Sequence, residues 1–173
     1  MARISLLSEA SAPPEFQETF RRINEKGGRV LNLFKTMAHS PQVGSQFLKL
    51  GNTILFKGII PPKMRELAIL RVGHLNKAIY EWTQHVPIAL GVGVRQVQID
   101  ALPQWESSGQ FDDAEKAILR YTDEVTMNIR VKDETFAAVR AIFSEEGVVE
   151  LTTAIGFYGM VCRILETLQV ELE

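Results

Sequence analysis

The helical spacing of the apolar residues is the feature that most restricts the fold of this chain. Apolar side chains recur every three or four residues along most of the sequence, strand-like alternation is scarce, and prolines and glycines fall mostly between the patterned segments. We therefore expect an all-α fold of about seven to nine helices. The pattern predicts helices over 14–25, 29–38, 61–75, 78–90 and 94–102, helices that begin near 41, 113, 133 and 144, and a loop over 103–111.

The length and composition are typical of one globular domain. The chain has 173 residues, of which 46% are hydrophobic, so it can bury a sizeable core without disulfide or metal staples. We expect a single domain over residues 1–173, in which residues 1–28 are an N-terminal extension that packs on the core or on a neighbouring subunit.

Charge and cysteine content argue against several classes of protein. The net charge is −2, so we expect no nucleic-acid partner. Cys162 is the only cysteine, which excludes an internal disulfide, a CxxC redox pair and a zinc cluster, and fits a cytoplasmic protein. The uncharged run over 151–162 is shorter than the ~20 residues that cross a bilayer, so it predicts a buried core helix and no membrane partner.

A glutamate stands inside an apolar stripe of the predicted helix over 61–75. Glu66 shares its helical face with residues three, four and seven positions further on, and the opposite side of the helix is also apolar. We expect the Glu66 carboxylate to be desolvated, which suits a carboxyl group to acid–base work near neutral pH. The alternative is a structural ion pair with Arg65, with Arg71 or with an arginine elsewhere.

The next predicted helix pairs a carboxylate with an imidazole. Glu81 and His85 are four residues apart, so their side chains can touch on one helical face. Histidine has the ordinary pKa nearest neutrality, and a Glu–His pair beside Glu66 could shuttle a proton. Pro87 is expected to kink this helix, because proline has no amide hydrogen to donate. The alternative is a histidine that is hydrogen-bonded in the core or at a subunit contact.

The same residue types also occur in metal sites. Glu66, Glu81 and His85, joined by His74 or His39, offer carboxylate and imidazole ligands. Di-iron helical sites use paired Glu-x-x-His motifs, whereas this chain has a single Glu-x-x-x-His. We therefore expect no metal and no cofactor.

Two nearby stretches of the sequence resemble the carboxymuconolactone decarboxylase family, which includes the alkylhydroperoxidase D-like proteins. They are residues 65–72, which read RELAILRV, and residues 80–85, which read YEWTQH. The resemblance extends over roughly 30–170, through segments at 32–41, 93–94, 99–102, 150–152, 156–160 and 163–165. It implies the all-helical alkylhydroperoxidase D-like fold and a homo-oligomer, either a trimer or a hexamer of paired subunits.

The redox branch of this family combines a glutamate, a CxxC pair and a following histidine. Glu66 and His85 match that glutamate and that histidine, but Ala78 and Glu81 stand at the two cysteine positions. Disulfide cycling needs an attacking thiolate and a partner sulfur, and Cys162 is far along the chain. A peroxidase-type antioxidant protein is therefore the disfavoured alternative.

The decarboxylase branch works without thiols and acts on lactones from aromatic-compound catabolism. The resemblance thus implies a cofactor-free lyase or isomerase that transfers protons on a small carboxylated or lactone substrate. In this hypothesis His85 is the general acid or base, Glu66 tunes or relays its proton, and Glu81 orients the imidazole.

Four further residues are assigned to the substrate in this hypothesis. Tyr80 and Gln84 would donate hydrogen bonds to a substrate carboxylate or oxyanion, while Trp82 and Phe47 would line an apolar pocket for a small ring. The remaining alternative is a non-catalytic oligomer that binds a small molecule.

Overall fold

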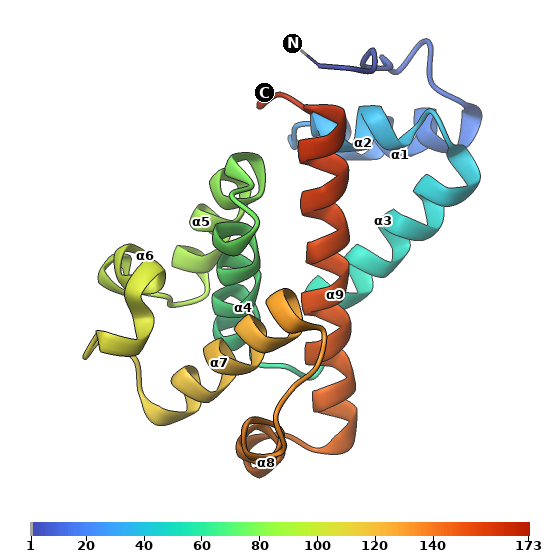
Figure 1. Cartoon of the computed structure of the whole chain (residues 1–173). Coiled ribbons are helices and arrows are strands. Elements are labelled where there is room, and N and C mark those ends of the chain that lie inside the picture. The colour runs from blue at the N-terminus through green and yellow to red at the C-terminus, as the bar shows by residue number, and fades with distance from the viewer. Residues whose placement is uncertain (1) are drawn as a thin grey trace. The chain divides into compact units, whose positions relative to one another are not determined.

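The computed structural model describes residues 2–173, and in these residues nine α-helices and one 3-10 helix occur without any β-strand (Figure 1). This confirms the predicted all-α fold. The elements are α1 (Pro14–Glu25), α2 (Asn32–Met37), α3 (Pro41–Phe56), α4 (Pro62–Leu75), α5 (Ile79–Gly91), α6 (Gln96–Ala101), the 3-10 helix η1 (Leu102–Ser107), α7 (Asp113–Asn128), α8 (Asp133–Ile142) and α9 (Glu145–Leu168).

Local sequence signals set most of the helix boundaries. A proline lies in the first turn of α1, α3 and α4, where the missing amide hydrogen costs nothing. The Asp112 carboxylate accepts a hydrogen bond from the Glu115 amide at 2.8 Å, and the Glu115 side chain accepts one from the Asp112 amide at 3.1 Å. This reciprocal capping box fixes the start of α7. Gly27 follows α1 with a φ of 73°, which glycine adopts without strain.

The predicted loop over 103–111 is wrong in its first half. Residues from Leu102 to Ser107 form η1, and the Trp105 side chain within it is only 1% exposed. Helix α5 continues through Pro87 as far as Gly91, and the expected kink there stays a prediction.

Backbone contacts divide the chain into two compact units. Unit 1 comprises the residues up to Lys57 together with 164–173. Its core joins Phe16 and Phe20 of α1 to Val30 and Ala38, so the N-terminal segment packs inside this unit. Helix α1 approaches α3 very closely at Gly44, where a Cβ atom would lie only 2.7 Å from the Phe16 ring.

Unit 2 comprises residues 58–163, and α4 is its central helix. Every residue of α4 from Arg65 to Gly73 is buried. Helices α4 and α5 lie side by side, and α7 also packs against α4 (Figure 1). The core between these elements contains Leu67, Leu70, Trp105 and Leu119. A polar side chain on α4 is therefore held inside protein and away from bulk water.

A partly buried ion pair fastens α4 to α7. Arg71 donates from Nε and Nη2 to the two oxygens of Asp123, at 2.6 and 2.9 Å, and from Nη1 to the Leu102 carbonyl at 2.8 Å. The Trp105 indole donates to the same carboxylate at 3.0 Å. Arg71 is thus paired with Asp123, so of the arginines offered as partners of Glu66 it is not the one used.

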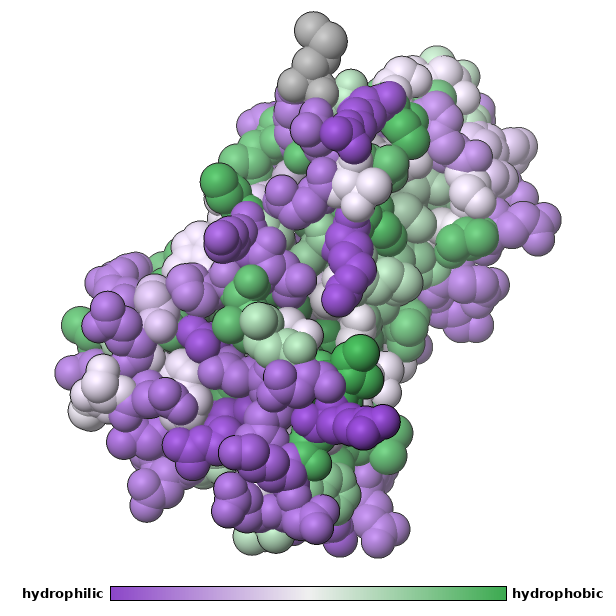
Figure 2. Space-filling model, in the orientation of Figure 1, coloured by the Kyte–Doolittle hydropathy of each residue, from purple (hydrophilic) through white to green (hydrophobic). Residues whose placement is uncertain are grey.

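Within the described part of the chain, one helix is long and apolar enough to cross a membrane. This is α9, but 56% of its most apolar window is buried inside the protein, as in a core helix. On the face shown in Figure 2, apolar residues form separate patches among polar ones. The large apolar side chains that are more than half exposed include Phe56, Ile79 and Ile129.

Candidate functional site

A hydrogen bond between α4 and α5 forms the centre of the candidate site. His85 Nδ1 lies 2.7 Å from Glu66 Oε2, so the imidazole donates to the carboxylate. The Glu66 side chain is 0% exposed and that of His85 is 8% exposed. Because α4 and α5 are adjacent and both faces are apolar around this contact, the pair is held away from water. The structure brings together the two residues that the sequence singled out first.

A second carboxylate stands at the other ring nitrogen. Glu81 Oε1 lies 3.0 Å from His85 Nε2, one turn earlier on α5. This oxygen is fully buried, and it has no hydrogen-bond partner among the described residues. Buried polar atoms normally have a partner. Glu66 therefore makes the hydrogen bond to the imidazole, Glu81 faces Nε2, and the orienting role expected of Glu81 stays a prediction.

Arg65 balances the charge of this cluster. Its Nε donates to Glu66 Oε1 at 3.3 Å, and its side chain is only 8% exposed. With His85 protonated, two carboxylates and two cations lie together in the interior. Burying charge is costly unless it is paired, and here the formal charges of Glu66, Glu81, Arg65 and His85 sum to zero. The predicted ion pair of Glu66 with Arg65 is thus present together with the Glu66–His85 contact.

Tyr158 of α9 forms the third side of the site. Its ring meets the His85 ring edge to face, with the centroids 4.9 Å apart. Burial, reinforced by the negative charges of Glu81 and Glu66, raises the pKa of Tyr158 far above its ordinary value. The hydroxyl therefore stays protonated. The sequence did not identify this residue, because an aromatic side chain in an apolar helix is typical of a core position.

The protonation state of His85 follows from these neighbours. Burial by itself lowers the pKa of His85, but the hydrogen bond to Glu66 and the adjacent Glu81 carboxylate outweigh burial and raise it from 6.5 to about 9. The imidazole therefore carries a proton on each nitrogen at pH 7. It can give up a proton as an acid, and it can act as a base only after it has lost one.

The other predicted substrate residues take different positions. Tyr80 is buried and Gln84 is half-buried, both on α5 beside the Glu81–His85 pair in sequence. Trp82 packs against the core of unit 2, with its ring 6.2 Å from that of His74. Phe47 is buried in unit 1. The substrate-binding role of all four stays a prediction.

The two other histidines have separate contacts. His74 lies beside Trp82, and the His39 Nε2 atom is 2.8 Å from the Ser5 carbonyl oxygen. Within residues 2–173, no group of three or more His, Cys, Asp or Glu side chains is arranged to hold a metal ion.

A family model matches the central part of this sequence. The sequence model of the carboxymuconolactone decarboxylase family matches residues 41–124, which include α4, α5 and the whole Glu66–Glu81–His85 cluster. This region belongs to the carboxymuconolactone decarboxylase family. The resemblance seen in the sequence is thereby confirmed, and Tyr158 lies beyond the matched region.

The individual relatives carry different descriptions, and the solved structures among them share the fold of this chain. An uncharacterized protein, YdfG of Bacillus subtilis, is 30% identical over 93 residues, which are 53% of this chain and 63% of that protein. The alkylhydroperoxidase AhpD core of a peroxidase-related protein from Ralstonia eutropha superposes with a TM-score of 0.87 at 20% identity, over 99% of this chain and 92% of that one. The debrominase Bmp8 in complex with 2,3,4-tribromopyrrole superposes with a TM-score of 0.79 at 20% identity, over 100% and 94%. At this identity the likeness establishes the alkylhydroperoxidase D-like fold and no particular reaction.

Proposed function

We propose that this protein is a cofactor-free lyase or isomerase that delivers a proton to carbon in a small carboxylated or lactone substrate. The observation that carries the proposal is the buried contact of 2.7 Å between Glu66 and His85, with a second carboxylate at the opposite ring nitrogen. This arrangement supplies an imidazolium acid at neutral pH, which is the group that protonation of a carbanion needs.

The proposed step is a decarboxylation followed by proton transfer. The bond between the ring carbon and the carboxylate breaks, carbon dioxide leaves, and the electron pair is delocalised onto the lactone carbonyl. The Nε2–H bond of His85 then breaks as a new C–H bond forms. The Nδ1–H group stays hydrogen-bonded to the Glu66 carboxylate, which stabilises the positive imidazole before the transfer. After the product leaves, a new proton restores the Nε2–H bond, and the Glu81 carboxylate 3.0 Å away stabilises the protonated ring again.

Tyr158 supports this proposal from the third side. Because its pKa is raised, its hydroxyl remains a hydrogen-bond donor across the whole working pH range. A donor beside the His85 ring would stabilise the enolate oxygen that forms when carbon dioxide leaves.

Thiol chemistry receives no support from the residues of this chain. Ala78 and Glu81 occupy the positions of the redox pair in the resemblance, and the Cys162 residue is only 1% exposed within α9. A buried thiol in apolar surroundings is a poor nucleophile. Peroxide turnover that required added thiol and disappeared in Cys162→Ser would favour the peroxidase alternative instead.

The experiment is turnover of a panel of small carboxylated unsaturated lactones, followed by carbon dioxide release and by NMR of the product. We expect His85→Asn and Glu66→Gln each to lower kcat by about 100-fold or more, the usual contribution of a general acid. His39→Asn is the matched control, because His39 contacts the Ser5 carbonyl oxygen and belongs to no part of this cluster. Equal turnover by wild type and by both cluster variants would contradict the proposal.

The binding alternative gives a different result in the same panel. A non-catalytic oligomer would bind one of these compounds, measured by calorimetry, and release no product with any of them. The family resemblance also carries the proposal of a homo-oligomer, and light scattering in solution distinguishes a trimer from a hexamer.

A further inference from the structure

A second candidate binding site lies in unit 1, apart from the residues of the proposed function. A groove of about 530 Å³ runs between α1 and α3. Its floor is apolar and consists of Phe16, Ile23, Phe34 and Leu48. The Phe16 side chain is 1% exposed, and the other three are partly buried. This volume lies in the range of small-molecule pockets.

The rim of the groove carries one sign of charge. Arg22 and Lys26 at the end of α1, with Lys49 and Lys57 on and after α3, line it, whereas no acidic residue does. Arg22 is paired with Glu18 on the same helix. The three lysines form no ion pair with any described residue of the chain. Lys26 and Lys57 directly follow the last residues of α1 and α3, where the helix dipole favours a positive charge. Lys49 lies inside α3, so the helix dipole does not account for its charge at the groove.

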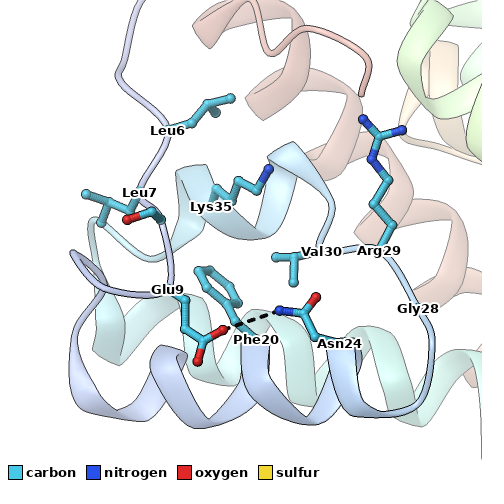
Figure 3. Close-up of a pocket in the computed structure, with 10 residues that line it drawn as sticks. Leu6, Leu7, Glu9, Phe20, Asn24, Gly28, Arg29, Val30 and Lys35 are labelled. Atoms are coloured by element: carbon cyan, nitrogen blue, oxygen red, sulfur yellow. Dashed lines mark hydrogen bonds between the residues drawn. The ribbon is translucent and has the colours of Figure 1, made fainter.

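The other pocket of unit 1 provides a contrast. Figure 3 shows it between the N-terminal segment and α1, with Leu6, Leu7, Phe20 and Val30 among its lining residues. Glu9 also lines it and accepts a hydrogen bond from Asn24 at 3.3 Å. The Glu9 carboxylate in that pocket opposes an anionic ligand, whereas the α1–α3 groove has an apolar floor and no acidic lining residue.

We propose that the α1–α3 groove binds a free organic carboxylate with an apolar body, such as a medium-chain fatty acid. The floor removes the apolar body from water, and the lysine ammonium groups attract the carboxylate. Lysines on flexible stems act as point charges, so they attract a carboxylate without fixing its orientation. The groove contains no residue of the Glu66–His85 cluster, so this proposal stands independently of the catalytic one.

Calorimetric titration with three ligands tests the proposal. Octanoate has both the charge and the tail, octanamide has the tail without the charge, and acetate has the charge without the tail. We expect octanoate to bind at least about tenfold more tightly than either of the others, and more weakly as sodium chloride rises from about 50 to about 500 mM. Equal binding of octanamide and octanoate, or no binding of octanoate, overturns the proposal.

A charge-matched pair of variants locates the site. Lys26→Glu combined with Lys49→Glu should weaken octanoate by about tenfold or more, because two attractive charges become repulsive. Arg130→Glu combined with Lys132→Glu changes the net charge equally at exposed positions of unit 2, and should change the affinity by less than about twofold. Circular dichroism confirms that both variants are folded. An equal loss of octanoate affinity in both variants would mean that octanoate responds only to the net charge of the protein, which also overturns the proposal.

Discussion

The protonation of His85 is the property on which the proposed chemistry depends, and Glu66→Gln perturbs it directly. The glutamine Oε1 can still accept the Nδ1 proton, so the variant removes the charge and keeps the shape of the contact. The rise in the pKa of His85 from 6.5 to about 9 corresponds to about 3 kcal/mol in favour of the imidazolium. Because burial opposes that rise, loss of the Glu66 charge should lower the pKa of His85 from its wild-type value of about 9.

NMR titration of the histidine rings measures this change. The chain has only three histidines, so His39 and His74 serve as internal references, and His85→Asn assigns the remaining signal. Burial and the neighbouring Arg71 lower the pKa of His74, so its signal should titrate well below that of His85. The reasoning is refuted if the wild-type His85 signal titrates at or below 6.5, or if Glu66→Gln leaves it unmoved.

The same coupling predicts how stability depends on pH. The folded-state pKa of His85 is raised, so its contribution to the free energy of unfolding is complete below about 6.5 and is lost as pH rises through about 9. The loss is at most about 3 kcal/mol. Urea unfolding of wild type and His85→Asn should show a wild-type stability that falls over this window relative to the variant. A constant difference between the two proteins across the window would contradict the assignment.

Three further substitutions test the fold around the site. Gly44→Ala places a Cβ atom 2.5 Å from the Met37 carbonyl oxygen and should lower the free energy of unfolding by about 1–3 kcal/mol. An unchanged Tm would mean that α3 does not pack this closely against the residues around Gly44. Ile129 ends α7 with a φ of 65° and is 87% exposed, so Ile129→Gly should raise stability by about 0.5–1 kcal/mol, and a loss in urea unfolding would contradict that strain. Asp123→Asn leaves the Arg71 cation without its counter-charge and should cost about 2–3 kcal/mol, whereas a loss below about 0.5 kcal/mol would show that the ion pair is dispensable.

The sequence predicted the pair at the centre of the site for a physical reason. Glu66 and His85 lie on consecutive helices joined by a short connection, and both stand within apolar faces. Two such helices pack side by side, which places their inward polar groups together. The family resemblance assigned the same two positions. The choice between Arg65 and Arg71 could not be made in advance, because both flank the apolar stripe and only the position of Asp123 on α7 decides it.

Two other features needed the structure because their signals are ambiguous in sequence. Tyr158 contacts His85 from a helix far along the chain, and its apolar neighbours made it indistinguishable from a core aromatic residue. The 3-10 helix around Trp105 is too short to show a periodic pattern, so its proline and polar residues resembled a loop. In both cases tertiary packing, and not local propensity, determines the outcome.

The pH dependence of kcat/KM, measured for a turned-over carboxylated lactone, tests the central claim most directly. If His85 is the acid, the rate falls above pH about 9 in wild type, and this limb moves down in Glu66→Gln by the same amount as the NMR pKa. His39→Asn should leave the profile unchanged. A limb that stays near 9 in Glu66→Gln while the NMR pKa moves, or full activity in His85→Asn, would show that another group delivers the proton.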